Sequence, residues 1–307
     1  MSASDDRRVV REGTVVSEDT VVSEGTVVRE GTVDGLAAVI VETPHSRAAI
    51  SLFGGQVISF VPAGSKSDVL WVSPLLATLP TPIRGGIPVC WPYFSREGQP
   101  GDVPSHGYAR TARWTLTATN TTPDGEVEIE LEPGGLDHLD LRLQMTVVVG
   151  ADLRQGLHTS NSGAQPVRLT EALHNYFRVS DATAVRVEGL SGRGYIDKFD
   201  GGRTHHQDGE WTLSPDDPRS DRLYPDAGGT YRLVDPGLGR VITVTGYSAR
   251  SAIVWNPGEA GGAAMADVGA HWREFVCVET ANAGPDVIDL GAGETHSMWQ
   301  QIDVAAT

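Results

Sequence analysis

Cysteine is scarce in this sequence of 307 residues, which contains only Cys90 and Cys277. Both lie in apolar, strand-like segments, so we expect buried free thiols rather than a disulfide bridge. Two cysteines are also too few for a four-cysteine zinc site. A chain of this length can bury a large core without covalent cross-links.

Positive charge is scarce as well. The chain has 24 basic and 40 acidic residues, a net charge of −16 and a pI near 4.9. A general nucleic-acid-binding protein needs a basic face, so this composition argues against a nucleic-acid partner. An anionic small molecule remains compatible, because a few local arginines can override the global field.

Long apolar runs are missing. No run approaches the roughly 18 apolar residues of a transmembrane helix. The first residues lead into no apolar segment of the kind found in a secretory signal peptide. We therefore expect a cytoplasmic protein with no membrane partner, and we expect it to be a monomer.

Known catalytic and phosphate-binding motifs are missing too. The sequence contains no Gly-x-x-x-x-Gly-Lys-Ser/Thr phosphate loop and no Gly-x-Gly-x-x-Gly after a strand. It has no Gly-x-Ser-x-Gly elbow, so serine hydrolase chemistry lacks its usual sign. His205, His206 and Asp208 could suggest a metal, but adjacent residues on a strand point to opposite faces, and we expect no metal there.

Short strand-like runs fill the chain from Val33 onward, separated by Gly, Pro, Asn and Asp. Residues 126–132 alternate glutamate with Val, Ile and Leu, as in an antiparallel strand with one buried face. Many short strands at close spacing predict an all-β sandwich or barrel with few short helices. No composition change divides the chain after residue 34, so residues 34–307 are predicted to form one β-domain.

The N-terminal part has a different pattern. Residues 9–32 hold four hexapeptides that begin with Val-Val and end with Thr. Four short copies are too few to bury a core of their own. We expect residues 1–33 to form a low-complexity, mostly disordered tail, with an extra strand that pairs with the body as the alternative.

Two ionisable residues share strand faces with apolar side chains. Residues 275–282 read as a strand, and alternation places Glu279 on the face of Phe275 and Cys277. His174 lies in a similar run and shares a face with Ala172 and Tyr176. A buried unpaired carboxylate is costly, so Glu279 needs a partner or a task, unless it lies at a strand end in water. His174 is equally compatible with a hydrogen-bonded core histidine.

Other polar residues suggest a binding surface. Arg84 precedes two glycines that allow close approach of a ligand. His106 and Arg110 lie on one face if their segment is a strand. Asp221 precedes a strand-like run. Each of these residues could instead be a solvated surface group.

Taken together, these segments resemble the glucose-6-phosphate 1-epimerases, the hexose-6-phosphate mutarotases of the aldose 1-epimerase superfamily. The resemblance covers about residues 34 to 303 and rests on six motifs in the family's order. They are Arg84-Gly-Gly-Ile-Pro, His106-Gly-Tyr-Ala-Arg110, Ala172-Leu-His-Asn-Tyr-Phe177, Ser220-Asp-Arg-Leu-Tyr224, Val254-Trp-Asn-Pro257 and Phe275-Val-Cys-Val-Glu-Thr-Ala281.

The resemblance implies a large antiparallel β-sandwich of the galactose mutarotase type, with His174 and Glu279 as the catalytic pair. It further implies that the sugar phosphate contacts Arg84, His106, Arg110 and Asp221. Ser105 stands where some relatives carry a substrate-binding glutamine, and the shorter serine could reach the sugar only through a water.

The expected activity is an isomerase reaction, the interconversion of the α and β anomers of glucose 6-phosphate or related hexose 6-phosphates. Glu279 fits the base that takes the C1 hydroxyl proton, and His174 fits the acid that protonates the ring oxygen. This chemistry requires no metal and no redox cofactor. The alternatives are a mutarotase for unphosphorylated sugars and a non-catalytic carbohydrate-binding β-sandwich.

Overall fold

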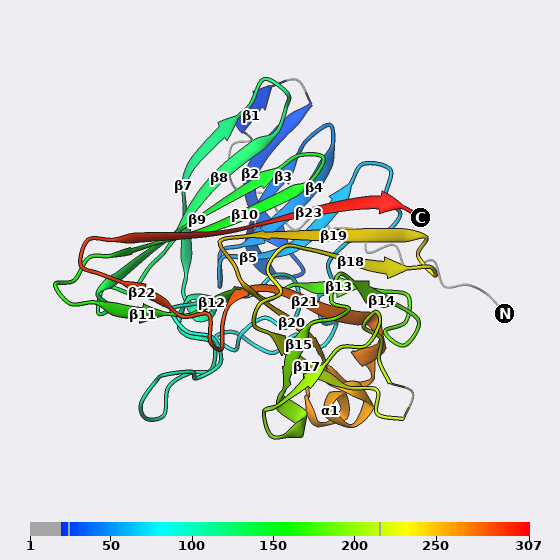
Figure 1. The fold of residues 1–307 in the computed structure, drawn as a ribbon. Coiled ribbons are helices and arrows are strands. Elements are labelled where there is room, and N and C mark those ends of the chain that lie inside the picture. Colours follow the sequence, from blue (N-terminus) through cyan, green and yellow to red (C-terminus); the bar gives the residue numbers. More distant parts are fainter. Residues whose placement is uncertain (1–19, 24, 215) are drawn as a thin grey trace.

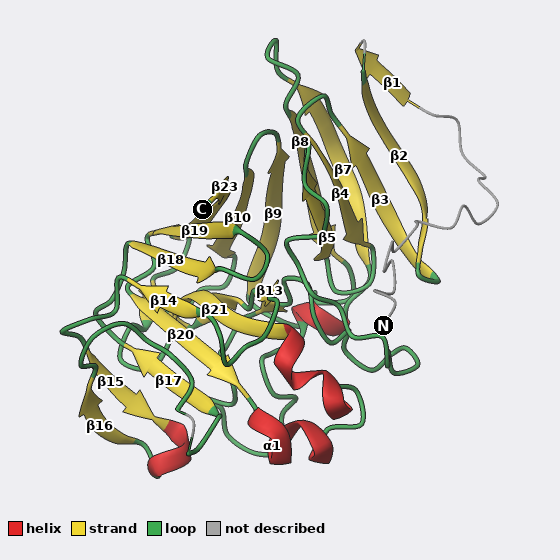
Figure 2. Cartoon of the chain, turned by 90° about the vertical axis from the view of Figure 1, so that its right-hand side faces the viewer, coloured by secondary structure: helices red, strands yellow, loops and turns green. Residues whose placement is uncertain are grey.

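The computed structural model describes residues 20–23, 25–214 and 216–307. Antiparallel strands dominate these ranges, which confirms the expected all-β class with few short helices (Figures 1 and 2). The helical elements are α1 (Gly258–Ala264) and the 3₁₀ turns η1 (Ala109–Thr111), η2 (Lys198–Asp200) and η3 (Gly269–Glu274). Within the described ranges, no helix is long and apolar enough to cross a membrane.

The large sheet of eight strands runs in the order β14-β18-β19-β23-β10-β9-β8-β7. In β8, Val127, Ile129 and Leu131 are fully buried between partly exposed or exposed glutamates, as the alternation predicts. The strands are β7 (Trp114–Thr121), β8 (Val127–Pro133), β9 (Leu141–Val149), β10 (Leu153–Asn161), β14 (Arg186–Glu188), β18 (Thr230–Asp235), β19 (Arg240–Tyr247) and β23 (Thr295–Ala306).

A second sheet packs beside β7, β8 and β9 (Figure 2). Its strands are β1 (Thr20–Ser23), β2 (Thr26–Val33), β3 (Leu36–Glu42), β4 (Ser46–Ser51) and β5 (Gln56–Pro62), paired in that order. Apolar side chains of this sheet, among them Val39, Ile50 and Phe60, join the main hydrophobic core.

The hexapeptide repeat forms part of this second sheet. Residues 20–23 and 26–33, which include most of its last two copies, make β1 and β2, and β2 pairs with β3 over the register from Val27–Glu42 to Val33–Leu36. Residues 26–33 therefore form a paired strand, whereas disorder was the first expectation. The open edge of β3 supplies hydrogen-bond partners that the repeat lacks alone. Residues 1–19 lie outside the described ranges.

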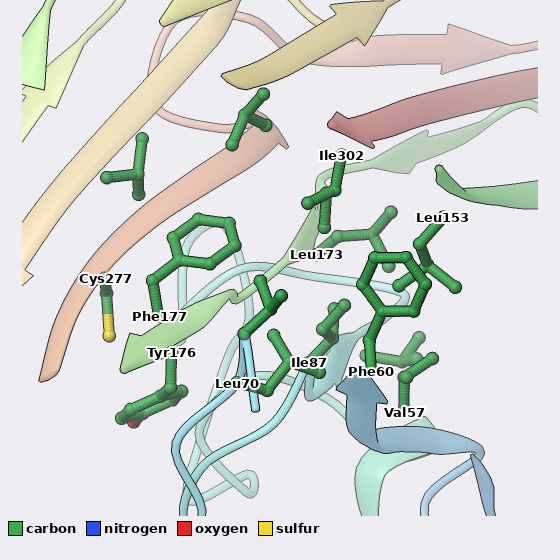
Figure 3. Packing of buried hydrophobic residues seen from close by; sticks show 14 of the residues in the cluster. Val57, Phe60, Leu70, Ile87, Leu153, Leu173, Tyr176, Phe177, Cys277 and Ile302 are labelled. Atoms are coloured by element: carbon green, nitrogen blue, oxygen red, sulfur yellow. The ribbon is translucent and has the colours of Figure 1, made fainter. Parts of the chain in front are cut away.

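The third sheet lies below the large sheet in Figure 1 and runs in the order β16-β15-β17-β20-β21-β12-β6, with β13 also on β21. One face packs toward the core, and Figure 3 shows Phe177 and Tyr176 leaving β13 on opposite sides. The strands are β6 (Val89–Cys90), β12 (Glu171–Leu173), β13 (Tyr176–Arg178), β15 (Gly194–Asp197), β16 (Arg203–His206), β17 (Ser220–Tyr224), β20 (Ser251–Asn256) and β21 (Phe275–Asn282); β11 (Val167–Leu169) and β22 (Ile288–Leu290) form a separate pair.

Candidate active site

One face of the third sheet collects most of the predicted site residues. Directly opposed residues in an antiparallel pair project to the same face, as do residues two apart on a strand. The register opposes Tyr176 to Cys277, and opposes Trp255 to both Cys277 and Asp221. By this alternation the face, called the site face below, carries Ala172, His174, Tyr176, Asp221, Trp255, Cys277 and Glu279.

His174 and Glu279 meet on the site face. His174 Nε2 lies 3.4 Å from Glu279 Oε1, and the two side chains are 11 % and 1 % exposed. Glu279 Oε2 and His174 Nδ1 are buried and have no hydrogen-bond partner among the described residues. Buried polar atoms without partners are costly, and they are the atoms that a bound hydroxyl could satisfy.

Burial shapes the protonation of this pair. It raises the pKa of Glu279 well above that of an ordinary glutamate, Asp221 raises it further, and Lys198 partly offsets the rise. Burial also lowers the pKa of His174, with a further contribution from His106 and two nearby arginines. Both shifts favour the uncharged side chains, so the pair favours its neutral form over its ionic form. Its neutral and ionic forms differ only by proton transfer across the short contact.

His106 stands beside this pair on the loop between β6 and η1. Its ring centre lies 5.8 Å from that of His174 and 4.9 Å from that of Phe94. The Ser95 N–H donates to His106 Nδ1 over 3.2 Å, so the proton of the neutral ring is on Nε2. Burial lowers the pKa of His106 to about 3, which keeps the ring neutral at physiological pH. His106 is thus a neutral hydrogen-bond donor through Nε2.

Arg84 is linked to the pair through Tyr176. Its Nη1 donates to Tyr176 Oη over 3.0 Å, and its Nε donates to Asp267 over 3.0 Å. The Tyr176 ring stacks on the His174 ring with centres 4.8 Å apart and planes at 9°. Gly85, at φ 109°, has no room for a side chain, since an added Cβ would lie 2.4 Å from the Trp71 carbonyl oxygen. This close packing holds Arg84 in place.

Arg110 and Asp221 complete the charged surroundings. Arg110 is half-buried, forms no hydrogen bond or ion pair with a described residue, and interacts electrostatically with Tyr176 and Arg84. Burial lowers its pKa, as expected for a cation without an anion. Asp221 is half-buried, and burial raises its pKa while Lys198 lowers it. Ser105 is half-buried next to His106 in the chain and donates no side-chain hydrogen bond to a described residue.

The structure therefore brings together six of the predicted residues and places Ser105 beside them. It also adds residues that the sequence analysis did not assign, namely Tyr176, Trp255, Asp267 and Lys198. Strand alternation places Tyr176 on the same face as His174, and this pattern could have identified Tyr176 as a site residue. Nothing in the sequence around Asp267 indicates its contact with Arg84, because 183 positions separate the two residues.

A polar cleft of about 600 Å³ lies elsewhere, beside the turn between β8 and β9 and the facing parts of β10 and β23. Its lining includes Arg142, His158 and His296 but none of the seven predicted site residues. The site face, by contrast, holds the buried His174–Glu279 pair and Arg110, whose side chain has no hydrogen-bond or ion-pair partner among the described residues. Among the described residues, no three His, Cys, Asp or Glu side chains gather as metal ligands would.

Comparisons with known proteins identify the family to which the sequence is similar. The sequence profile of the aldose 1-epimerase family matches residues 38–303. A protein of Escherichia coli strain K12, provisionally named a glucose-6-phosphate 1-epimerase, is 34 % identical over 261 residues, covering 82 % of this chain and 85 % of its own. A protein of Cenchrus ciliaris with the same provisional name is 30 % identical over 276 residues, covering 85 % and 82 %.

Solved structures show the same fold. A Salmonella typhimurium protein, provisionally described as a mutarotase, superposes with a TM-score of 0.82 at 29 % identity, covering 93 % of this chain and 95 % of its own. A galactose mutarotase-like protein from Clostridium acetobutylicum superposes with a TM-score of 0.70 at 11 % identity, covering 93 % and 100 %. The expected galactose mutarotase type of fold is thereby confirmed.

Proposed function

Since this chain belongs to the aldose 1-epimerase family, we propose that it interconverts the α and β anomers of glucose 6-phosphate, with Glu279 as base and His174 as acid. One observation carries the proposal. The buried pair with a 3.4 Å contact lies next to Tyr176, whose hydroxyl accepts a hydrogen bond from Arg84. An acid and a base therefore stand beside a cation that can bind a phosphate.

The reaction needs two proton transfers at one acetal carbon. Glu279 takes the proton of the C1 hydroxyl, and His174 protonates the ring oxygen as the C1–O5 bond breaks. The open aldehyde turns about its C1–C2 bond and closes on its other face, with the two roles reversed. Proton transfer of this kind typically contributes about 10²–10⁴-fold for each group. His106 supports the opening by donating from Nε2 to the ring oxygen or to a neighbouring hydroxyl.

The phosphate requires local cations. It carries roughly −1.5 to −2 charges at pH 7, while the protein carries −16. The guanidinium donors of Arg110 have no partner among the described residues, and Arg84 is held by Asp267 and Tyr176. Arginine forms bidentate, charge-assisted hydrogen bonds with phosphate oxygens, so this pair of side chains favours a phosphorylated sugar.

The deciding experiment compares anomerisation of glucose 6-phosphate and glucose by NMR exchange, in the wild type and in Arg84→Ala and Arg110→Ala. We expect both variants to raise KM for glucose 6-phosphate by about 10-fold or more, the usual loss for a charged hydrogen bond, with little change in turnover of free glucose. Equal effects on both sugars would assign the protein to unphosphorylated aldoses. Sugar binding without turnover in the wild type would indicate a binding module.

The cytoplasmic location, the monomeric state and the independence from cofactors stay predictions of the sequence. The division into residues 1–33 and 34–307 likewise stays a proposal, tested by the stability and activity of a protein that begins at residue 34.

A further inference from the structure

Lys198 lies at the edge of the site face, and the proposed proton transfers do not use it. Lysine occurs only twice in the sequence, as Lys66 and Lys198. Lys198 begins η2 directly after β15, and the register of β15 with β17 opposes Ile196 to Leu223 and Asp197 to Arg222. The next step of that register brings Lys198 alongside Asp221.

The ammonium group of Lys198 is held loosely. Its Nζ lies 4.8 Å from the ring centre of Phe94 and 3.8 Å from Glu97 Oε1. Phe94 in turn packs edge-on against His106. The Lys198 and Glu97 side chains are 32 % and 31 % exposed, and Lys198 donates no hydrogen bond to a described residue. An ammonium has three donors, so this group can bind a ligand without breaking a hydrogen bond of the protein.

The arginines and Lys198 act on different members of the His174–Glu279 pair, although all three cations act on His106. The two arginines interact with Tyr176, at the His174 end. Lys198 is the cation that acts on both Asp221 and Glu279, at the other end. The arginines can therefore bind an anionic group of the substrate. Lys198 can donate hydrogen bonds to sugar hydroxyls, and Asp221 can accept hydrogen bonds from them.

The order of these side chains matches the order of atoms in a pyranose phosphate. The phosphate on C6 lies next to C5 and the ring oxygen, C1 follows, and C2 and C3 come after C1. In the structure, Arg84 contacts Tyr176, Tyr176 stacks on His174, and His174 contacts Glu279. Asp221 and Lys198 follow Glu279. If His174 protonates the ring oxygen and Glu279 takes the proton of the C1 hydroxyl, then Asp221 and Lys198 face C2 and C3.

We infer that Lys198, paired with Asp221, is a substrate-binding residue that donates to the hydroxyls on C2 and C3 and so selects the sugar. This inference rests on the proposed reaction. The contacts with Phe94 and Glu97 keep the ammonium at the edge of the site until the sugar arrives. A purely structural bridge between η2 and the His106 loop is the competing explanation, and sugar analogues separate the two.

The first test measures kcat/KM for glucose 6-phosphate, 2-deoxyglucose 6-phosphate and 3-deoxyglucose 6-phosphate. Lys198→Met should lower kcat/KM for glucose 6-phosphate by about 10-fold or more, the loss expected for a hydrogen bond to a charged group. The loss should shrink on at least one deoxy sugar, because the partner hydroxyl is gone. Lys198→Arg should restore part of the activity, and Lys66→Met should match the wild type.

Equal losses on all three sugars would show a structural role and overturn the inference, as would unchanged activity of Lys198→Met. Neither result would contradict the proposed reaction. That proposal is contradicted only if the wild type does not anomerise glucose 6-phosphate.

The second test uses the scarcity of lysine. Acetylation by an N-hydroxysuccinimide ester, followed by mass spectrometry, reports on Lys198 and Lys66 in one sample. Glucose 6-phosphate should slow acetylation of Lys198 severalfold and leave Lys66 unchanged. Inorganic phosphate should protect neither lysine, since it occupies only the arginines. Protection of Lys198 by inorganic phosphate would make it a phosphate ligand and contradict its assignment to C2 and C3.

Discussion

Among the described residues, two deeply buried glutamates each lie close to a histidine, and the two pairs differ little in geometry. His174 Nε2 lies 3.4 Å from Glu279 Oε1 on the site face, and His296 Nε2 lies 3.5 Å from Glu171 Oε1. Both glutamates are almost fully buried, and the side chains of His174 and His296 are 11 % and 14 % exposed. Glu171 precedes His174 by three positions, and this odd spacing directs the two side chains to opposite faces of the third sheet.

The pair of Glu171 and His296, called the inner pair, makes its closest polar contacts with neutral side chains, while the charge of Asp286 also acts on His296. Glu171 Oε2 lies 3.5 Å from the Thr159 hydroxyl, and His296 Nε2 lies 3.0 Å from Asn282 Oδ1. Burial raises the pKa of Glu171 to about 8 and lowers that of His296. Glu171 is therefore a neutral acid at pH 7, although 3.5 Å would suit an ion pair, because neither partner is charged.

The pair of His174 and Glu279, called the outer pair, has several charged neighbours. Asp221 and Lys198 act on Glu279, while Arg84 and Arg110 act on His174. A close histidine–glutamate contact is thus insufficient evidence for catalysis. The surrounding charges distinguish the two pairs, because they can bind a charged, hydroxyl-rich ligand.

The largest expected effect is on catalysis by the outer pair. Glu279→Gln and His174→Asn should each lower kcat for glucose 6-phosphate anomerisation by about 10²–10⁴-fold, because each removes one proton-transfer group. NMR exchange between the anomers measures the rate, and circular dichroism checks the fold. Glu171→Gln is the matched control and should leave kcat nearly unchanged at pH 7, since its amide replaces a carboxyl that is already neutral. Comparable losses in Glu171→Gln would remove the distinction between the pairs.

The second expected effect is on stability and concerns the inner pair. Glu171 has a pKa of about 8 in the folded chain against a reference value of 4.5. Below pH 4.5 the carboxyl is protonated in both states. As the pH rises toward 8 the unfolded chain releases this proton first, so the wild type loses up to about 5 kcal/mol of stability relative to Glu171→Gln.

Urea unfolding of both proteins between pH 5 and pH 9 measures this difference. The free energy of unfolding of Glu171→Gln minus that of the wild type should grow with pH and level off above about pH 8. A difference that does not change with pH would mean that Glu171 ionises in the folded protein as it does in water.

The smallest expected effect concerns the substrate contacts near the outer pair. Ser105→Gln should lower KM for glucose 6-phosphate by less than about threefold, because a longer side chain replaces a contact that serine can make only through a water. The value of kcat should stay the same, and Ser105→Ala serves as the control. A large change in kcat would place Ser105 in the proton-transfer chemistry, which its half-buried position beside His106 does not suggest.

Much of the site could be predicted from local patterns. The strand predicted for residues 275–282 is β21, with the same bounds. The alternation that places His174 and Tyr176 on one face, with Asn175 and Phe177 on the other, is also observed. Asn175 donates to the Val278 carbonyl and to Gln300 on the core side.

Other elements depend on their partners. Residues 167–177 are apolar enough for one strand but are divided into β11, β12 and β13. Leu70 and Val72 form only isolated bridges, to Phe177 and Gly85. The twelve residues of β23 carry many polar side chains and no strong strand pattern. They form a strand because β10 and β19 hydrogen-bond to both of their edges.

Alternation along single strands is enough to assign Glu279 and His174 to strand faces, because side-chain direction depends only on the local backbone. The pairing of His174 with Glu279, the contact of Arg84 with Asp267, and the position of Lys198 beside Asp221 are set by sheet register and loop packing between segments far apart in the chain. Register follows from the packing of the whole core, so the neutral inner pair and the charged outer pair become distinct only in the folded protein.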